Sequence, residues 1–314
     1  MSDITQRGRF DAAPVPAGAL RPGNLYRLAR RRSTIAFLFA LPLLLVLAGL
    51  IVYPGFYAIY LSLLNKAQTK FVGFGNYAFL FTRDTFWAVV WQSCLFAVSA
   101  VFFKSLLGII TAHLVNNLPT KGQRKWRGML LIPWVIPLSL STLGWFWLLD
   151  PTYSAFNWLL TRAGGPEIPW LSDPAWARVS AILVNVWFGS PFFLIMYLAA
   201  LKSVPEQLYE AAAIDGANAW QKLVHITLPM MRNIISITVL FSLIVTFANY
   251  DIVRVLTNGG PRNSTHVFAT WAFQLGIASG DIPLGASISL FMFPILGISA
   301  IFILRGVRRR GREI

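Results

Sequence analysis

Residues 87–115 read WAVVWQSCLFAVSAVFFKSLLGIITAHLV, with Lys104 as the one full charge. A membrane-spanning helix needs about 20 predominantly apolar residues, so this stretch is long enough to cross a bilayer. The whole chain of 314 residues has a similar character, because 56% of its residues are hydrophobic and only 12% are charged. Soluble domains carry about 25% charged residues, so this chain has too few polar side chains to cover a water-soluble surface. The sequence therefore predicts a membrane protein.

Six segments, this one included, are long and apolar enough to span a membrane. They are Thr34–Leu64, Trp87–Val115, Trp126–Leu149, Ala175–Leu201, Met231–Thr257 and Pro283–Leu304. The first follows a basic stretch, as a secretory signal would, but its apolar run is far longer than the roughly 7–15 residues of a signal core. We therefore expect an uncleaved first helix and an all-α, polytopic membrane helix bundle with six transmembrane helices over residues 34–304.

Lysine and arginine are distributed unequally between the loops of this layout. With the N-terminus inside, the inner segments hold 19 of the 27 basic residues and the outer side holds 7. An excess of Lys and Arg marks the cytoplasmic side of a membrane protein, so residues 1–33 and the basic residues 305–314 are predicted to be cytoplasmic tails. Because topology accounts for the net charge of +15, we expect membrane lipid, and no nucleic acid, among the partners.

Residues that carry catalysis or hold metal ions are scarce. Cys94 is the single cysteine and the three histidines lie far apart in the sequence, so neither a disulfide nor a metal site is predicted. No Gly-Lys dipeptide occurs, which excludes the phosphate-binding loop G-x-x-x-x-G-K-[ST] of P-loop ATPases. We expect no catalytic residues, no enzymatic activity and no cofactor in this chain.

Polar side chains inside the predicted spans fall on two helical faces. In the fourth and fifth spans, four residues each follow the spacing i, i+3, i+4 and i+7, which places them on one face. The two sets are Asn185, Phe188, Gly189 and Phe192, and Ser242, Val245, Thr246 and Asn249. Amides and hydroxyls can hydrogen-bond a sugar, and an aromatic ring can pack on its C–H surface. Because the same residue types also hold membrane helices together, the spacing alone leaves substrate lining and helix contact both open.

Lys104 and Asp251 lie inside predicted spans at opposite depths. For Lys104 the sequence favours an ammonium that reaches the cytoplasmic interface along its apolar stem. Asp251 is expected near the outer surface, so no carboxylate is expected at mid-membrane depth. Ion-coupled carriers commonly use such a carboxylate, and its absence argues against them.

The longest inner loop between spans, residues 202–230, carries the signals of a short helix. Ser203 and Glu206 have the spacing of a capping box for a helix over Glu206–Asp215. Gly216 follows, and glycine suits the left-handed residue that commonly ends a helix.

A second helix is predicted directly afterwards. Asn218 and Gln221 resemble another cap, for a helix over Ala219–Thr227 that Pro229 would end. An amphipathic helix lying on the membrane would usually carry Lys or Arg along its polar face, and this loop has few. We therefore favour a docking site for a partner protein.

The same loop carries a family signature. Its residues reproduce the pattern E-A-A-x3-G-x9-I-x-L-P, at Glu210, Ala211, Ala212, Gly216, Ile226, Leu228 and Pro229. This pattern resembles the signature of membrane subunits of binding-protein-dependent ABC importers. Residues 257–261, TNGGP, resemble the T-x-G-G-P segment of the maltose-type carbohydrate branch, and the fourth span is similar to that branch at Asn185, Trp187, Gly189 and Pro191. The resemblance covers roughly residues 34–304.

The resemblance implies the type I, MetI-like permease fold and two groups of functional residues. In that family the loop forms coupling helices that sit in a cleft of a cytoplasmic ATPase, which implies coupling roles for Glu210, Ala211, Ala212, Asp215 and Gly216. The family's sugar contacts lie on the two helical faces described above, which favours substrate lining for them. Four positions match the maltose-type pattern in residue type, namely Asn185, Gly189, Ser242 and Asn249. The other four, Phe188, Phe192, Val245 and Thr246, depart from it and leave the identity of the sugar open.

The expected function is that of a permease subunit of an ATP-driven importer for a carbohydrate, such as a di- or oligosaccharide, in a bacterial inner membrane. The implied partners are a second permease subunit in a heterodimer, two copies of a P-loop ATPase that binds ATP and Mg²⁺, and a periplasmic solute-binding protein. The alternative is a self-sufficient ion-coupled carrier or channel for a small polar solute. Such a protein would have no use for a docking loop.

Overall fold

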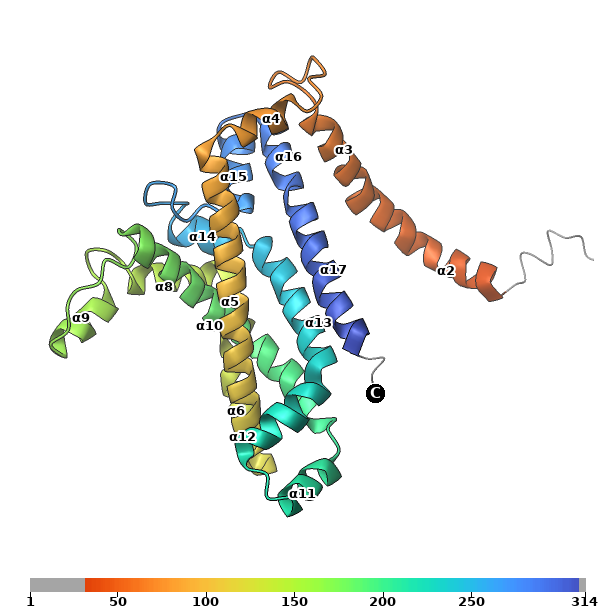
Figure 1. Ribbon diagram of the computed structural model, residues 1–314. Coiled ribbons are helices and arrows are strands. Elements are labelled where there is room, and N and C mark those ends of the chain that lie inside the picture. The colour runs from red at the N-terminus through yellow and green to blue at the C-terminus, as the bar shows by residue number, and fades with distance from the viewer. Residues whose placement is uncertain (1–31, 311–314) are drawn as a thin grey trace, which may run out of the picture. The chain divides into compact units, whose positions relative to one another are not determined.

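The computed structural model describes residues 32–310 and places most of them in helices (Figure 1). The elements comprise α-helices and three π-helical turns, η1 to η3. In chain order they are α2 (Arg32–Leu47), η1 (Ala48–Val52), α3 (Tyr53–Ser62), α4 (Gly75–Phe81), α5 (Asp84–Asn116), α6 (Thr120–Leu130), α7 (Ile132–Val135), α8 (Leu138–Leu148), α9 (Ala155–Arg162), α10 (Pro174–Lys202), α11 (Glu206–Ile214), α12 (Ala219–Lys222), η2 (Leu223–Thr227), α13 (Leu228–Phe247), α14 (Asp251–Leu256), α15 (Phe268–Phe273), η3 (Gln274–Ala278), α16 (Ile282–Leu290) and α17 (Met292–Arg310). An isolated β-bridge joins Leu64 and Phe71. The all-α prediction is confirmed for the described residues.

The chain divides into two compact units, residues 1–56 and 57–314. The described part of the first unit is helical and presents its large apolar side chains outward, with Phe39 84% and Leu50 74% exposed. Such a continuous apolar surface suits lipid rather than water. The predicted tail 1–33 lies almost entirely outside the described residues. In the second unit, α17 continues to Arg310, so part of the predicted tail 305–314 is helical.

Within residues 32–310, five helices are long and apolar enough to cross a membrane. They are Ala36–Ser62, Asp84–Asn116, Pro174–Lys202, Ala219–Phe247 and Ile282–Ile303. The predicted first, second, fourth and sixth spans agree with them to within a few residues. The start of the fourth is fixed locally, because the Asp173 carboxylate accepts hydrogen bonds from the backbone N–H groups of Ala175 and Trp176, at 2.9 and 3.1 Å, and caps the helix.

The predicted third span, Trp126–Leu149, is not one helix but is divided among α6, α7 and α8. Ile136 is extended, with φ −75° and ψ 135°, because a proline at the next position excludes the helical conformation. Pro133, inside α7, has no backbone N–H with which to continue the hydrogen bonding from α6. Among the residues that the structure describes, the helices that could span a membrane in one piece therefore number five and not six.

The predicted fifth span, Met231–Thr257, is also divided. α13 ends at Phe247 and α14 begins at Asp251. α14 packs against α8, and the Ser139 hydroxyl donates a hydrogen bond of 3.1 Å to the Asp251 carboxylate. The two broken spans therefore lie against each other.

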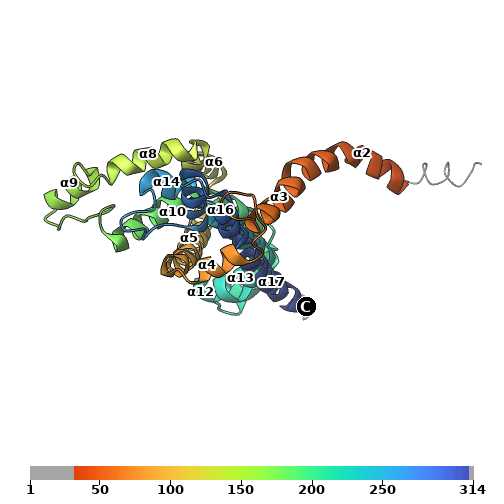
Figure 2. The same cartoon turned by 90° about the horizontal axis from the view of Figure 1, so that it is seen from above.

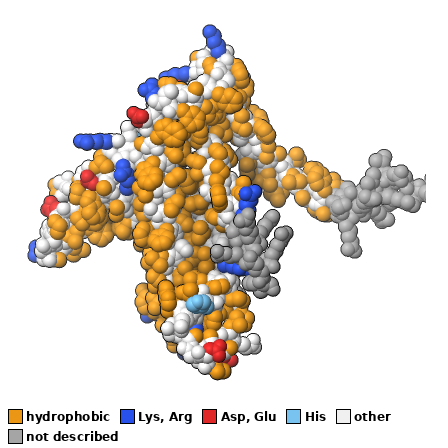
Figure 3. Space-filling model, in the orientation of Figure 1, with side chains coloured by type: hydrophobic (Ala, Val, Ile, Leu, Met, Phe, Trp, Pro, Cys, Tyr) orange, Lys and Arg blue, Asp and Glu red, His pale blue; other side chains and the backbone are white. Residues whose placement is uncertain are grey.

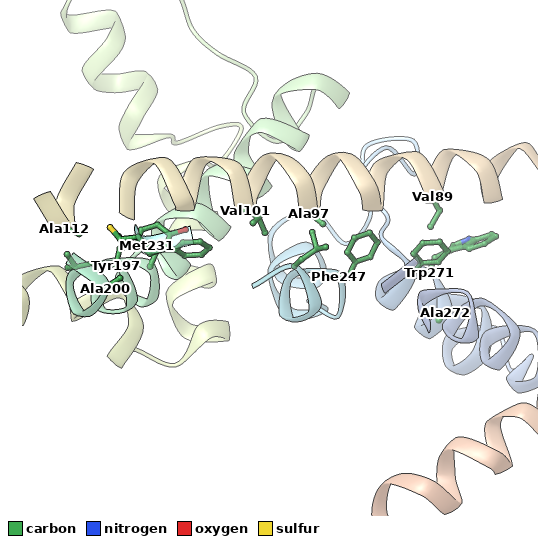
Figure 4. Close-up of a cluster of buried hydrophobic side chains, with 14 of the residues drawn as sticks. Val89, Ala97, Val101, Ala112, Tyr197, Ala200, Met231, Phe247, Trp271 and Ala272 are labelled. Atoms are coloured by element: carbon green, nitrogen blue, oxygen red, sulfur yellow. The ribbon is translucent and has the colours of Figure 1, made fainter. Parts of the chain in front are cut away.

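The core of the second unit is built around α5, which packs against α10 and α13. Figure 4 shows buried side chains along α5, from Val89 to Ala112, facing Tyr197 on α10, Phe247 on α13 and Trp271 on α15. Figure 2 shows these helices gathered together, with α8 and α9 extending to one side. Much of the visible surface in Figure 3 is hydrophobic, as expected for contact with lipid.

Candidate functional site

The α11–α12 loop forms a tight turn that depends on Gly216. This residue has φ +77°, the left-handed conformation that glycine adopts without steric cost. The backbone N–H of Ala217 donates to the carbonyl of Ala212 at 2.8 Å, and that of Gly216 donates to Ala213 at 3.1 Å. This pair of bonds is the Schellman motif, which closes the carbonyl end of a helix. The predicted glycine end of the first helix is confirmed.

The two predicted helix caps have different outcomes. Asn218 and Gln221 form the capping box as expected, with bonds of 2.9 and 2.7 Å between each side chain and the other's backbone N–H. The Ser203 cap is wrong, because the Ser203 hydroxyl donates to the carbonyl of Ala200 at 2.7 Å and closes α10 instead. Pro205 precedes α11 and provides no side-chain cap.

The second helix does not end at Pro229 as predicted. The helix from Ala219 continues to Phe247, and the π-helical turn η2 directly precedes α13, in whose first turn Pro229 lies. Proline lacks the N–H that an α-helix needs at this point, and a π-turn lets the chain continue past it. The Tyr209 and Thr227 hydroxyls, 2.9 Å apart, join α11 to this continuous helix.

The loop presents apolar side chains to its surroundings. Ile214 is 88% exposed and Trp220 is 71% exposed. Of the predicted coupling residues, Glu210, Ala211, Asp215 and Gly216 are exposed and Ala212 is half-buried. Acidic side chains and a histidine gather at this end of the molecule in Figure 3. Large exposed apolar groups rimmed by polar residues are typical of a surface that another protein covers.

The two predicted helical faces in the membrane come together only in part. Asn185, Ser242 and Thr246 are buried, and Phe188, Gly189 and Phe192 are half-buried where α10 packs against α5 and α13. Val245 is 50% exposed and lies on the outer side of α13. Asn249 lies beyond the end of α13, where its side-chain oxygen accepts a hydrogen bond from the backbone of Ile252 at 3.1 Å.

Lys104 does not extend to the cytoplasmic interface as predicted. Its side chain is only 5% exposed, and its Nζ donates a hydrogen bond of 3.0 Å to the Thr246 hydroxyl. The lysine stem lies against Gly189, where a Cβ would come within 2.6 Å of Lys104 Cε. Lys104 therefore joins the two predicted faces. The sequence feature that pointed to Lys104 was its position as the one charge within a long apolar span.

Two aromatic residues outside the predicted set extend the α10 face. The Phe192 ring lies 5.9 Å from that of Trp134 on α7 and 5.2 Å from that of Phe241 on α13, between ring centroids. Trp134 is 46% exposed and Phe241 is 53% exposed. Helical spacing did not identify Trp134 as a site residue, because Trp134 lies within the broken third span, where that spacing does not apply.

On the other side of the unit, the turn after α14 is held by buried polar groups. Gly259 has φ +85° and packs directly against the imidazole of His266. The Arg178 guanidinium on α10 donates to the carbonyl of Ser264 at 3.0 Å. Burial lowers the pKa of His266 below the ordinary histidine value, and the charge of Arg254 lowers it further, although a hydrogen bond to Gln274 opposes the shift. The turn is therefore packed around a neutral imidazole.

Comparison with known proteins agrees with this architecture. Residues 104–312 match the family described as "Binding-protein-dependent transport system inner membrane component". The chain is 33% identical to the sulfoquinovosyl glycerol transport system permease SmoG of Agrobacterium fabrum, over 86% of this chain and 89% of that one. It is 31% identical to the trehalose/maltose permease MalF of Thermococcus litoralis, over 90% and 97%.

Solved structures share the fold. A chain of a bacterial alginate ABC transporter in complex with its periplasmic protein superposes with a TM-score of 0.78 at 23% identity, covering 91% of this chain and 97% of that one. A chain of the MetNI methionine ABC transporter superposes with a TM-score of 0.51 at 18% identity, covering 74% and 96%. The fold is therefore that of the MetI-like permeases, and the chain belongs to the family of inner membrane components of binding-protein-dependent transport systems.

Proposed function

We propose that this chain is one of two permease subunits of an ATP-driven importer that takes up a carbohydrate across a bacterial inner membrane. The two relatives described above are named as permeases for sulfoquinovosyl glycerol and for trehalose and maltose. The observation that carries the proposal is the exposed pair Ile214 and Trp220 on a loop fixed by Gly216. A protein surface of this kind needs a partner, and the sequence holds no phosphate-binding loop of its own.

The partner at this loop would be a P-loop ATPase, present in two copies and holding ATP and Mg²⁺. A second permease subunit and a periplasmic solute-binding protein would complete the importer. In this arrangement α11 faces the cytoplasm, as do both chain termini, in agreement with the excess of Lys and Arg on that side. Closure of the ATPases would displace α11 and α12, and the bundle would switch between two rigid arrangements.

The carbohydrate would bind where the α10 and α13 faces meet. Asn185, Ser242 and Thr246 would supply hydrogen-bonding groups, and Asn249 would do so from the break after α13. Gly189 would leave room for the sugar, and the rings of Phe188 and Phe192 would pack on its C–H surface. Val245 would contribute from the outer side of α13. Because several of these side chains are buried, the pocket would open only when α10 and α13 move apart.

The first test is purification of the chain from its native membrane in mild detergent, with the mass of the intact complex and identification of its subunits. We expect a second permease subunit and two ATPases. A homo-oligomer that moves solute in liposomes without ATP would instead establish the self-sufficient carrier.

The second test uses a charge reversal in the docking loop. Glu210→Lys should abolish ATP-dependent uptake in proteoliposomes, because it places a cation in the surface that meets the ATPase, while assembly persists. Glu167→Lys, an equally exposed carboxylate in the loop before α10, is the matched control and should transport normally. Equal uptake by the two variants would remove α11 from the coupling surface.

A further inference from the structure

The Lys104 side chain is a buried amine with few hydrogen-bond partners. Its one hydrogen bond goes to Thr246, although an ammonium has three donors. Among residues 32–310 no carboxylate forms an ion pair with it. A buried charge that lacks a partner is unfavourable, so an anion bound next to the amine would stabilise its protonated form.

The surroundings of Lys104 include an unused acceptor. Asn185 lies one helical turn before Gly189 on α10, is only 3% exposed, and its side-chain oxygen has no hydrogen-bond partner in the described part of the chain. Buried polar atoms are nearly always paired. Lys104 lies against Gly189, so the buried amine of α5 and the buried acceptor of α10 are about one helical turn apart along α10. Such a pair suits a ligand that carries both an anionic group and a hydroxyl.

The backbone beside Lys104 has the form of a binding site. Thr246 lies in the last turn of α13, just before the break at Ala248–Tyr250. Discontinuous membrane helices commonly form the substrate sites of transporters. The carbonyl end of a helix also favours a nearby cation, which helps the ammonium to persist when no ligand is present.

We propose that Lys104 binds an oxyanion of the transported solute, so that the importer takes up an acidic carbohydrate bearing a carboxylate, sulfonate or phosphate group. This inference rests on the proposed function. The anionic group would lie against Lys104 Nζ, and a sugar hydroxyl would donate to the Asn185 oxygen. Gly189 has no side chain at this point, and therefore leaves the ammonium accessible from the α10 side when the helices separate.

The test uses the complete importer, reconstituted with its binding protein and ATPases in proteoliposomes. The probes are radiolabelled maltose, a glucuronate-containing disaccharide, a sulfonated glucoside and a glycerophosphoryl sugar. We expect wild-type uptake of at least one acidic probe. Lys104→Met should lower kcat/KM for that probe about 10- to 100-fold, the usual effect of losing one hydrogen bond to a charged group. ATP hydrolysis stimulated by the binding protein should persist.

Lys70→Met, which removes an exposed lysine from the loop after α3, is the control and should leave uptake unchanged. If Lys104→Met fails to assemble, Gly189→Ala keeps the charge but presses a methyl group against the lysine stem, and should lower uptake of the acidic probe in the same direction.

The outcomes separate this inference from the proposed function. ATP-dependent uptake of maltose alone would overturn the inference and leave the carbohydrate importer intact. Acidic uptake that neither Lys104→Met nor Gly189→Ala changes would also overturn it, and would make Lys104 a structural group or a partner for a carboxylate of the second subunit. Absence of uptake of every probe by an assembled, ATP-hydrolysing complex would overturn the inference, whereas uptake without ATP by a homo-oligomer would overturn the importer itself.

Discussion

The close approach of α5 and α10 gives a prediction whose size follows from the structure. At Gly108 an added Cβ would lie 2.5 Å from the Phe193 Cβ and 3.2 Å from the Phe193 backbone carbonyl carbon. Non-bonded carbon atoms are comfortable at about 3.5–4.0 Å. Gly108→Ala therefore requires the two helices to separate by roughly 1 Å, because a side-chain Cβ and a backbone carbon cannot rotate away.

Forcing one extra methyl group into a close-packed contact costs about 1–3 kcal/mol. Alanine also favours the helix over glycine by about 1 kcal/mol, which would conceal part of that loss. Gly144→Ala is the matched control, because Gly144 lies inside α8 and has no atom within 4 Å of its added Cβ. Both variants gain the same helix propensity, so the difference in stability between them measures the cost of overpacking at Gly108.

The assay is thermal denaturation of the purified complex in mild detergent. The measured quantity is the fraction of the complex that remains monodisperse after heating to each temperature. A loss of 1 kcal/mol lowers Tm by about 2–4 °C for domains of 150–250 residues. Gly108→Ala should therefore melt several degrees below Gly144→Ala. Equal melting temperatures would refute the close packing of α5 on α10, and with it the position of Lys104 beside Gly189.

Three further predictions concern the loops. Gly216→Ala should uncouple ATP hydrolysis from transport, since a left-handed alanine costs about 1–2 kcal/mol and the turn would relax. Gly164→Ala imposes the same strain at φ +81° outside the α11–α12 loop and should transport normally. Tyr209→Phe removes the hydroxyl contact with Thr227, which destabilises the junction of α11 with the next helix by about 0.5–1.5 kcal/mol. It should lower the uptake per ATP hydrolysed. Tyr153→Phe, at an 87% exposed position, is the control and should leave this ratio unchanged. The pKa of His266 is lowered in the folded state by burial, so the fold favours the neutral imidazole. The free energy of folding is then unaffected by His266 above the histidine pKa of the unfolded chain, about 6.5, and becomes less favourable as the pH falls from there through the lower pKa of the folded state. Hydrogen-exchange protection factors in residues 258–266, corrected for the pH dependence of the intrinsic exchange rate, should fall on acidification, and His266→Gln, if it folds, should remove that pH dependence.

Apolar run length and short local signals predicted most of the fold. The spans at α5 and α10 agree with the structure because an uninterrupted apolar run permits little except a helix in a membrane. The turn at Gly216 and the cap at Asn218 were predictable because they depend on residues adjacent in the sequence. The Ser203 cap failed because a serine near a helix end can instead bond back to the preceding turn, as it does to Ala200.

The broken spans and the candidate pocket were less predictable. Proline at positions 133 and 137 indicated a break in the third span. The span was nevertheless predicted as one helix because its apolar run is long enough to cross a membrane. The break after Phe247 has no proline. The Asn249 side chain accepts from the backbone N–H of Ile252 at the start of α14, and α14 packs against α8, a tertiary contact that no local pattern records. The position of the Lys104 side chain likewise depends on contacts with Gly189, 85 positions later in the chain, and with Thr246. Neither residue could be assigned to it before the helices were placed.

α13 connects the two candidate sites as one element. Directly before its first residue, Thr227 of η2 contacts Tyr209 of α11, and in its last turn Thr246 contacts Lys104 of α5. The two threonines are about 28 Å apart along a helix that rises 1.5 Å per residue. A helix resists compression along its axis. A displacement of α11 would therefore move the Thr246 end of α13, and its contact with Lys104, by nearly the same amount. The helix ends at Phe247, and the turn held by Arg178 through Ser264 lies after the break at Ala248–Tyr250. If the proposed function holds, the break would let α13 transmit a displacement of α11 to the Lys104 contact without moving that turn, which is what alternating access requires.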